Sequence, residues 1–172
     1  MIRIANKNDA AKIAEIYEHI HDAEEAGEAV VGWERNVYPT YRTALDGISK
    51  GDMFVEENGN TIVAAGRINK EQLDEYANCR WLYRAPDNEV MVLHTLVVDP
   101  RIKGRGYGSE FVKFYEEYAI SHNCHYLRID TQEKNTAARK FYKKLGFREA
   151  GITLCVFNEI PDVRLVCLEK KI

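Results

Sequence analysis

The amino-acid sequence predicts a single α/β (α+β) domain over residues 1–172, with a mixed central sheet of about six to seven strands flanked by about four helices. The length of 172 residues suits one domain with a full core. Strand-length apolar runs alternate with segments whose apolar residues recur at helical spacing. The second half follows the order strand, helix, strand, helix, strand, which requires crossover connections and is typical of a mixed sheet.

Composition and charge exclude several other classes of protein. Hydrophobic residues make up 45% of the chain and charged residues 30%, which is ordinary for a folded domain. No apolar stretch is long enough to span a bilayer, and the net charge of −3 argues against general nucleic-acid binding. The N-terminus lacks a signal-peptide pattern, and the cysteines are scattered without a C-x-x-C pair. We therefore expect a cytoplasmic protein with reduced thiols.

The first elements are predicted from apolar spacing. Residues 2–5 have the pattern of a strand, and a helix follows whose buried face consists of Ile13, Ile16, Tyr17 and Ile20. Asn8 or Asp9 is the expected cap of this helix, which ends before the glycines of residues 27–32. A shorter helix over about 40–48 follows Pro39.

A hairpin and an irregular segment come next. The Asn-Gly turn at residues 58–60 joins strands over 53–56 and 61–68. Residues 69–88 are polar and irregular, with one helical turn predicted near 71–76.

The second half begins with a nearly continuous apolar run from Val90 to Val98, which predicts a strand covered on both faces. The helix after it ends near residue 122 and buries Phe111, Phe114, Tyr115 and Tyr118. The remaining predicted elements are a strand over 126–131, a helix from Asn135 to Gly146, and strands over 147–156 and 163–169.

The glycine-rich run from Lys103 to Gly108 lies between a predicted strand and a predicted helix. A helix start offers unpaired N–H groups and the positive end of the helix dipole, and glycines let a bulky anion approach the backbone. Tight turns also need glycine, so this run alone is weak evidence for a phosphate site.

Local charge supports a polyphosphate ligand. Arg101, Lys103 and Arg105 place three cations within five residues of an acidic chain. Three lysines of the later helix, Lys140, Lys143 and Lys144, add to this charge. The alternative interpretation is a solvated basic turn.

Two separated signatures define a resemblance. They are Val98-x-Pro100-x-x-Lys103-Gly104-Arg105-Gly106-Tyr107-Gly108 and Asn135-x-x-Ala138-x-x-Phe141-Tyr142-x-x-x-Gly146-Phe147. Together they resemble the paired motifs of the GNAT superfamily of CoA-dependent N-acetyltransferases, and the element order resembles that superfamily over essentially the whole chain. Lys103 departs from the usual Gln or Arg, because lysine keeps the charge but lacks the planar fork of arginine.

The resemblance implies binding of acetyl-CoA, with CoA as product, and a cofactor site on both signatures and the preceding strand. The implied cofactor-binding residues are Leu96, Val97, Val98, Lys103, Gly104, Arg105, Gly106, Tyr107, Gly108, Ser109, Asn135, Ala138 and Tyr142.

The implied reaction is transfer of the acetyl group to a primary amine, by direct attack through a tetrahedral intermediate. An alkylamine with a pKa near ~10.4 is protonated at neutral pH, so a base is required. Negative charge on the thioester oxygen needs a backbone N–H donor, which the resemblance places on the strand of Leu96 to Val98. The resemblance assigns protonation of the departing CoA sulfur to Tyr142. The alternative is that its ring only packs under the sheet, but Phe141 is the expected core residue of the pair.

His94 is the candidate base. It lies four residues before Val98, so strand alternation predicts that it shares a face with Leu96 and Val98. An imidazole in such a strand is either held by a buried hydrogen bond or takes part in proton transfer, and both interpretations stay open. Glu89, at the entrance of the same strand, and an ordered water are the rival bases.

The acceptor site is predicted around Trp33 and Tyr38, whose aromatic faces suit a cationic amine. Acidic residues crowd the same segment: Asp22, Glu24, Glu25, Glu28 and Glu34. Ordinary solvated carboxylates are the favoured interpretation for most of them. No metal site is expected, since His122, Cys124 and His125 lack a fourth ligand nearby.

Two other functions stay open: a catalytically weak acyl-CoA-binding or sensing protein with the same fold, and a different nucleotide binder. The glycines lack the G-x-G-x-x-G spacing of dinucleotide-binding proteins, which disfavours the second. The expected partners are acetyl-CoA and an amine acceptor, without nucleic acid or membrane, and the oligomeric state is left open, a homodimer included.

Overall fold

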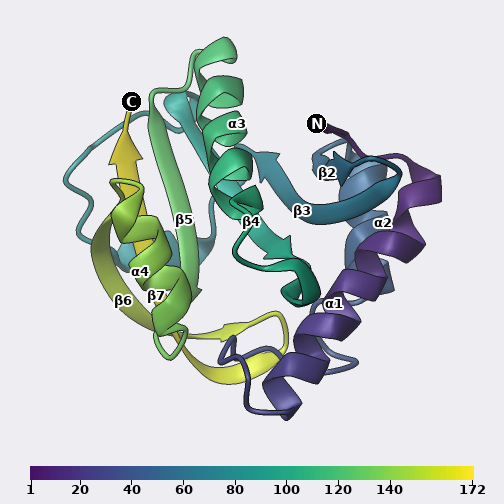
Figure 1. Ribbon diagram of the computed structural model, residues 1–172. Helices are drawn as coiled ribbons and strands as arrows, with labels where there is room; N and C mark the ends of the chain where they lie inside the picture. The colour runs from purple at the N-terminus through teal and green to yellow at the C-terminus, as the bar shows by residue number, and fades with distance from the viewer.

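The computed structural model describes residues 1–172 and contains one seven-stranded sheet with four α-helices (Figure 1). The helices are α1 (Ala10–Glu25), α2 (Tyr41–Lys50), α3 (Tyr107–Ser121) and α4 (Thr136–Lys144). The strands are β1 (Ile2–Ile4), β2 (Met53–Asn58), β3 (Thr61–Asn69), β4 (Val90–Val98), β5 (Tyr126–Gln132), β6 (Arg148–Phe157) and β7 (Ile160–Lys171). The predicted fold class is confirmed, and each predicted helix and strand is present with its bounds shifted by a few residues.

The sheet has the order β1-β2-β3-β4-β5-β7-β6. Strands β4 and β5 are parallel, and every other neighbouring pair is antiparallel. A parallel pair cannot be joined by a tight turn, so the chain crosses over through α3. The crossover predicted from the sequence is therefore present, and it places the start of α3 at the end of β4.

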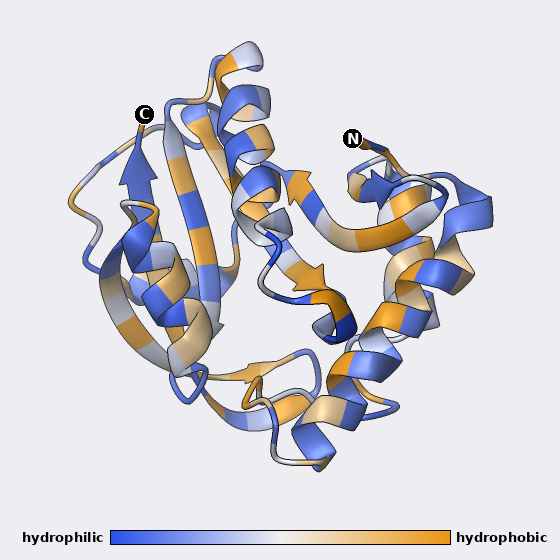
Figure 2. Cartoon of the chain, viewed as in Figure 1, coloured by the Kyte–Doolittle hydropathy of each residue, from blue (hydrophilic) through white to orange (hydrophobic).

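Helices cover both faces of the sheet. Helices α3 and α4 pack over the β4, β5 and β7 part, where Phe111 and Tyr115 contact a core that includes Leu93 and Ile129. Helices α1 and α2 lie beside β2 and β3, as Figure 1 shows, with Tyr17 buried in a second core cluster. Hydrophobic and hydrophilic segments alternate along α1 in Figure 2, as expected for a helix with one buried face.

The N-terminus of α1 agrees with the prediction in part. A short 3₁₀ turn, Lys7–Asp9, precedes the helix, and the side chain of Asn6 accepts a hydrogen bond from Asn8 N–H at 3.0 Å. The Asp9 carboxylate accepts the Asn6 N–H at 2.8 Å in return, which completes a capping box. Asn6 thus caps the 3₁₀ turn that leads into α1. Asp9 stands at the N-cap position of α1, one of the two predicted, although its side chain makes no capping hydrogen bond to that helix, and Asn8 lies inside the turn.

The irregular segment between β3 and β4 covers part of the sheet. It contains two 3₁₀ turns, Asp74–Asn78 (η2) and Asp87–Glu89 (η3), so the predicted turn lies slightly later than expected. Tyr76 of η2 is buried against Val90, Val92 and Cys167. The segment therefore shields the face of β4, β5 and β7 that lies opposite α3 and α4.

Glu56 is a buried carboxyl group on β2. Its side chain is almost fully buried, and its Oε2 has no hydrogen-bond partner. Burial first, and the neighbouring Glu110 carboxylate second, raise the pKa of Glu56 from 4.5 to about 7.

We expect Glu56→Gln to stabilise the protein at pH 8. The folded state holds a proton that the unfolded chain releases near pH 4.5, so stability is full below that pH and falls as the pH rises through 7. Gln removes this pH dependence of stability because its side chain does not ionise. Urea unfolding at pH 5 and pH 8 measures the effect, and equal pH dependence in both proteins would contradict it.

Candidate active site

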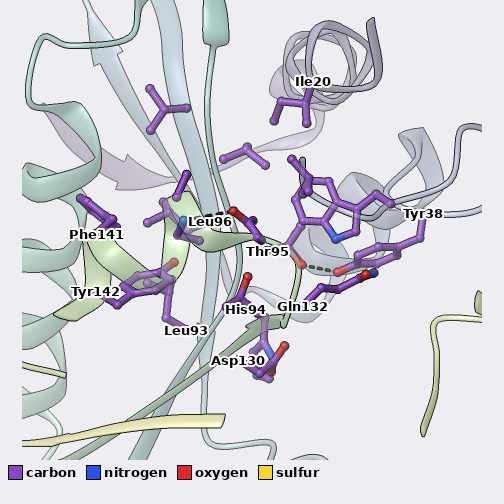
Figure 3. Close-up of a pocket in the computed structure, with 18 of the residues that line it drawn as sticks. Ile20, Tyr38, Leu93, His94, Thr95, Leu96, Asp130, Gln132, Phe141 and Tyr142 are labelled. Atoms are coloured by element: carbon purple, nitrogen blue, oxygen red, sulfur yellow. Dashed lines mark hydrogen bonds between the residues drawn. The ribbon is translucent and has the colours of Figure 1, made fainter. Parts of the chain in front are cut away.

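The central cavity opens where β4 and β5 separate. Their parallel pairing runs from Val90 opposite Tyr126 to Leu93 opposite Ile129, and stops there. A cavity of about 700 Å³ lies beyond this point. Its walls come from β4, β5, α4, the 28–38 segment and the 67–73 segment, and Figure 3 shows Tyr142 and Tyr38 on opposite sides with His94 and Asp130 between them.

A β-bulge in β4 shapes the wall of this cavity. Val97 pairs with Ala65 of β3 and His94 pairs with Arg67, so β4 contains one residue more than β3 between these pairs. The bulge centres on Thr95, whose φ of 52° lies in the left-handed region.

The bulge reverses the alternation of side chains along β4. Leu93, Leu96 and Val98 all pack against the core under α3 and α4. His94 faces the opposite side and bonds to Asn69, at the end of β3. The prediction that His94 shares a face with Leu96 and Val98 was therefore wrong, because the extra residue shifts the period of two by one.

The same register identifies free backbone donors. Asp99 N–H donates to Val63 carbonyl of β3 at 2.9 Å, and Val97 is paired with Ala65. Since N–H directions alternate along a strand, those of Leu96 and Val98 point away from β3, toward the gap that β5 leaves. They can donate to a ligand that lies in this gap.

The glycine-rich turn presents a row of unpaired N–H groups. From Lys103 to Gly108 no backbone N–H has a hydrogen-bond acceptor in the protein, and the first that does is Ser109 N–H, bonded to Gly106 carbonyl at 2.9 Å. Gly104 and Gly106 have φ of 86° and 88°, which disfavours any residue with a Cβ. This is the geometry of an anion-binding helix start.

The three cations around this turn differ in their partners. Arg101 is paired with Asp99 at 2.9 Å, so a carboxylate of the protein partly compensates its charge. Lys103 and Arg105 are exposed and form no ion pair, and Lys103 lines the cavity. Three exposed lysines of α4 do not line it: Lys140, Lys143 and Lys144.

The implied cofactor-binding residues fall into two groups. Those that line the cavity are Leu96, Val97, Val98, Lys103, Gly108, Asn135, Ala138 and Tyr142. Gly104, Arg105, Gly106, Tyr107 and Ser109 belong to the turn and first helical residues outside the cavity wall. Asn135 caps α4 by accepting Ala138 N–H at 3.0 Å, as expected, so its side chain is engaged locally.

Tyr142 presents its hydroxyl to the cavity. The residue is 7% exposed, and its ring packs edge-on against Phe147 at 5.8 Å between centroids. The hydroxyl has no hydrogen-bond partner in the protein and is not sealed from the cavity. Burial, and then the charge of Asp130, raise the pKa of Tyr142, so the hydroxyl keeps its proton.

The core assignment of the neighbouring aromatic was wrong. Phe141 was predicted to be the more buried of the pair, but it is half-buried and Tyr142 is buried. Both residues line the cavity, and the Phe141 ring also lies beside Gly108 at the start of α3.

His94 is held as a neutral ring. Asn69 donates its amide to Asp52 at 2.7 Å and accepts from Glu71 N–H at 2.9 Å, which fixes Oδ1 as the atom facing His94. His94 Nε2–H therefore donates to Asn69 Oδ1 at 3.0 Å, and Nδ1 has no hydrogen bond. Burial first, and the Arg67 charge second, lower the pKa of His94 to about 4, while Asp52 and Glu71 oppose this effect.

The rival base, Glu89, is remote from the cavity. It ends η3 at the entrance of β4, while the cavity begins beyond Leu93 near the other end of the strand. Glu89 is not among the lining residues, so the geometry excludes direct contact with a ligand in the cavity.

Trp33 and Tyr38 both line the cavity, where their rings form an edge-to-face pair at 5.9 Å between centroids. The Tyr38 hydroxyl bonds to the Thr95 hydroxyl at the bulge, as the dashed line in Figure 3 marks. This bond connects the 28–38 segment to β4.

Most of the acids near Trp33 have other partners. Arg35 binds Asp22 and Glu25, each at 2.6 Å, and Glu24 accepts Gly32 N–H at 2.6 Å. Of the acidic residues that the sequence places near Trp33, Glu28 lines the cavity. The majority are therefore structural or solvated carboxylates, the favoured interpretation from the sequence.

Sequence reasoning missed Asp130 and Gln132. Both line the cavity from β5, and Gln132 donates to Gly32 carbonyl, which ties the 28–38 segment to the sheet. The available signal was the alternation Leu127, Arg128, Ile129, Asp130, which looks like a strand with one solvent face. That face is instead covered by the 70–88 segment.

No group of three or more His, Cys, Asp and Glu side chains is arranged to hold a metal ion. None of the helices combines the length and apolar character that crossing a membrane requires.

Comparison with known proteins agrees with this fold. The sequence matches the acetyltransferase (GNAT) family over residues 13–147. An uncharacterized N-acetyltransferase of Methanocaldococcus jannaschii is 33% identical over 75 residues, covering 44% of this chain and 33% of that protein. The chain matches 33%, 44% and 49% of the lengths of the first three curated relatives.

Solved structures show the same fold. An acetyltransferase of the GNAT family from Streptococcus agalactiae 2603 superimposes with a TM-score of 0.82 at 21% identity, covering 100% of this chain and 95% of that one. The yncA protein of Salmonella typhimurium, solved with its cofactor acetyl-CoA, gives 0.67 at 19% identity over 99% and 92% of the two chains. The chain therefore belongs to the GNAT acetyltransferase family.

Proposed function

We propose that this protein is an acetyl-CoA-dependent N-acetyltransferase that transfers the acetyl group to a primary amine. The observation that carries this proposal is the unpaired row of N–H groups from Lys103 to Gly108, placed at one end of a cavity that continues to Tyr142. A ligand with a pyrophosphate at one end and a thioester at the other matches this arrangement.

The turn residues are proposed to hold the pyrophosphate of acetyl-CoA. Gly104 and Gly106 allow close backbone approach, and the exposed Lys103 and Arg105 supply positive charge. The N–H groups of Leu96 and Val98 point into the gap between β4 and β5, where they suit the amide and thioester carbonyls. Ala138 and Phe141 form the apolar wall on the α4 side.

Tyr142 is proposed as the general acid. Its hydroxyl keeps its proton because burial raises its pKa, and no protein group competes for that proton. A hydroxyl in this position can protonate the departing sulfur, while a backbone N–H of β4 stabilises the developing oxyanion.

His94 is proposed to orient the acceptor. With a pKa near 4 its ring is neutral and weakly basic, so it suits hydrogen bonding through Nδ1 better than storing a proton. Trp33 and Tyr38, on the same side of β4, are proposed to contact the rest of the acceptor.

We expect acetyl-CoA to raise the melting temperature of the protein, and NAD or ATP to leave it nearly unchanged. Acetyl-CoA at about 100 times its Kd should add roughly 2.7 kcal/mol of stability, because it binds the folded state alone. A thermal-shift series measures this, and no shift with acetyl-CoA would overturn the proposed function.

A CoA-release assay with a panel of primary amines separates the enzyme from its alternative. Amine-dependent steady-state release of CoA supports the acetyltransferase. A thermal shift without amine-dependent release from any amine of the panel would favour the catalytically weak acyl-CoA-binding protein.

A further inference from the structure

The cavity is lined by a carboxylate, that of Asp130, to which the chemistry proposed for Tyr142 and His94 assigns no role. Asp130 lies on β5 immediately after Ile129, the last residue paired with β4, and so stands where the two strands separate. Its Oδ2 accepts the Tyr76 hydroxyl at 2.8 Å. Its Oδ1 has no hydrogen bond in the protein, and the residue lines the cavity.

No cation compensates Asp130. Arg67, on the same side of the cavity, is bound through two hydrogen bonds to Asp52, at 2.9 and 2.8 Å. Glu71, another lining acid, lies 3.6 Å from Lys50, whereas Asp130 forms no ion pair. Since a half-buried carboxylate without a counter-charge is costly, a positive charge from outside the protein would be stabilised at this position.

Arg128 lies two residues before Asp130 on β5, but its guanidinium lies 3.9 Å over the Trp81 ring and donates to Gln72, and it forms no ion pair with Asp130. The other groups around Asp130 add no positive charge. From η2 it faces Tyr76 and the carboxylate of Glu75. The thiols of Cys79, Cys155 and Cys167 and the hydroxyls of Tyr38 and Tyr142 are close enough to be influenced by it, and all are neutral near pH 7. The neutral ring of His94 lies on β4, just beyond the point where β4 and β5 separate.

We propose that Asp130 binds the acceptor amine as an ammonium ion and takes the proton that this nitrogen must lose before attack. The inference rests on the proposed acetyltransferase function and defines its acceptor class as cationic primary amines.

The proton balance is straightforward. The ammonium gives one proton to the Asp130 carboxylate, which leaves a neutral amine whose lone pair forms the N–C bond of the tetrahedral intermediate. The C–S bond then breaks, and the leaving sulfur takes a proton from Tyr142, its proposed donor. The nitrogen loses its second proton to the Tyr142 oxygen, by way of solvent, so that Tyr142 ends protonated as it began. Asp130 then releases its proton to solvent, so the sum is an amide, free CoA and one proton.

Asp130 is better suited to this step than His94. Burial raises the pKa of Asp130 to about 6, whereas the pKa of His94 is lowered to about 4. The Asp130 carboxylate is therefore a stronger base than the His94 ring, and it is still ionised at pH 7.

The test compares Asp130→Asn with two other variants, Glu133→Gln and Tyr76→Phe. Cadaverine and n-butylamine serve as acceptors. We expect Asp130→Asn to lower kcat/KM by about 10²-fold or more and to leave the thermal shift with acetyl-CoA intact. Glu133→Gln, a carboxylate three positions further along that pairs with Arg164 outside the cavity, should stay within about 2-fold of the parent protein.

The pH profile gives a signature that a merely structural role would not produce. The parent kcat/KM should fall below about pH 6, as Asp130 becomes protonated. Tyr76→Phe removes the hydrogen bond that favours the ionised carboxylate, so its acidic limb should move to higher pH. Asp130→Asn should lose this limb.

The outcomes separate this inference from the proposed function. An Asp130→Asn variant with the parent kcat/KM and acidic limb would overturn the role of Asp130, while amine-dependent CoA release would still support the acetyltransferase. If the CoA-bound protein shows neither turnover nor a thermal shift with cadaverine or n-butylamine, the cationic acceptor class is wrong.

Discussion

Tyr142→Phe is expected to lower kcat by about 10² to 10⁴, the usual contribution of a positioned acid. The physical reason is that the Tyr142 hydroxyl is the proposed proton donor on the α4 side of the cavity and has no hydrogen-bond partner in the protein. Because the hydroxyl makes no hydrogen bond in the protein, its loss should cost less than about 1 kcal/mol of folding stability. Steady-state kinetics and thermal unfolding measure the two effects.

Acetyl-CoA binding should be nearly unchanged in Tyr142→Phe, since the ring packing remains. Tyr118→Phe is the matched control: Tyr118 lies on α3, outside the cavity, and its hydroxyl also has no hydrogen bond. Unchanged kcat in Tyr142→Phe would remove this residue from the mechanism.

Gly108→Val is expected to weaken acetyl-CoA binding by at least about 100-fold, or about 2.8 kcal/mol. A Cβ at this position would lie 3.2 Å from Phe141 and 3.6 Å from Val98. The larger side chain must therefore displace Phe141 or project into the space beside the unpaired N–H groups. Overpacking should also cost about 1 to 3 kcal/mol of stability.

Isothermal titration with acetyl-CoA measures the effect of Gly108→Val. The control on the same helix is Lys113→Ala, an exposed residue that pairs only with Glu117 at 3.8 Å. Equal affinity of the Gly108→Val and parent proteins would show that the start of α3 is not the binding surface.

The candidate site was predictable where it depends on local sequence. Glycines at positive φ, Asn135 at the start of α4 and an apolar central strand all leave signals in neighbouring residues. The 3₁₀ turn before α1 could not be predicted from the sequence. Asn6, Asn8 and Asp9 are all acceptable capping residues, and the backbone geometry selects among them.

His94 shows the limit of strand periodicity. Its predicted face follows from strict alternation, and the bulge at Thr95 breaks that alternation. A single extra residue leaves no mark in an apolar run, since Leu96, Val97 and Val98 satisfy either register.

Asp130 shows a second limit. In the sequence it resembles a solvent-facing residue of a half-buried strand, and only the packing of η2 over β5 makes it a cavity residue. That packing joins Tyr76 and Asp130, which are 54 positions apart. No periodicity within one element carries information about such a pair.

The sequence by itself determined the fold class, the order of the elements and the resemblance to the GNAT superfamily, because each depends on short-range patterns of apolar, capping and glycine residues. Tertiary structure alone decided which groups meet in the cavity. The separation of β4 from β5, the bulge at Thr95 and the cover over Asp130 arise from pairing and packing between distant segments. These contacts set the positions and the pKa values of His94 and Asp130.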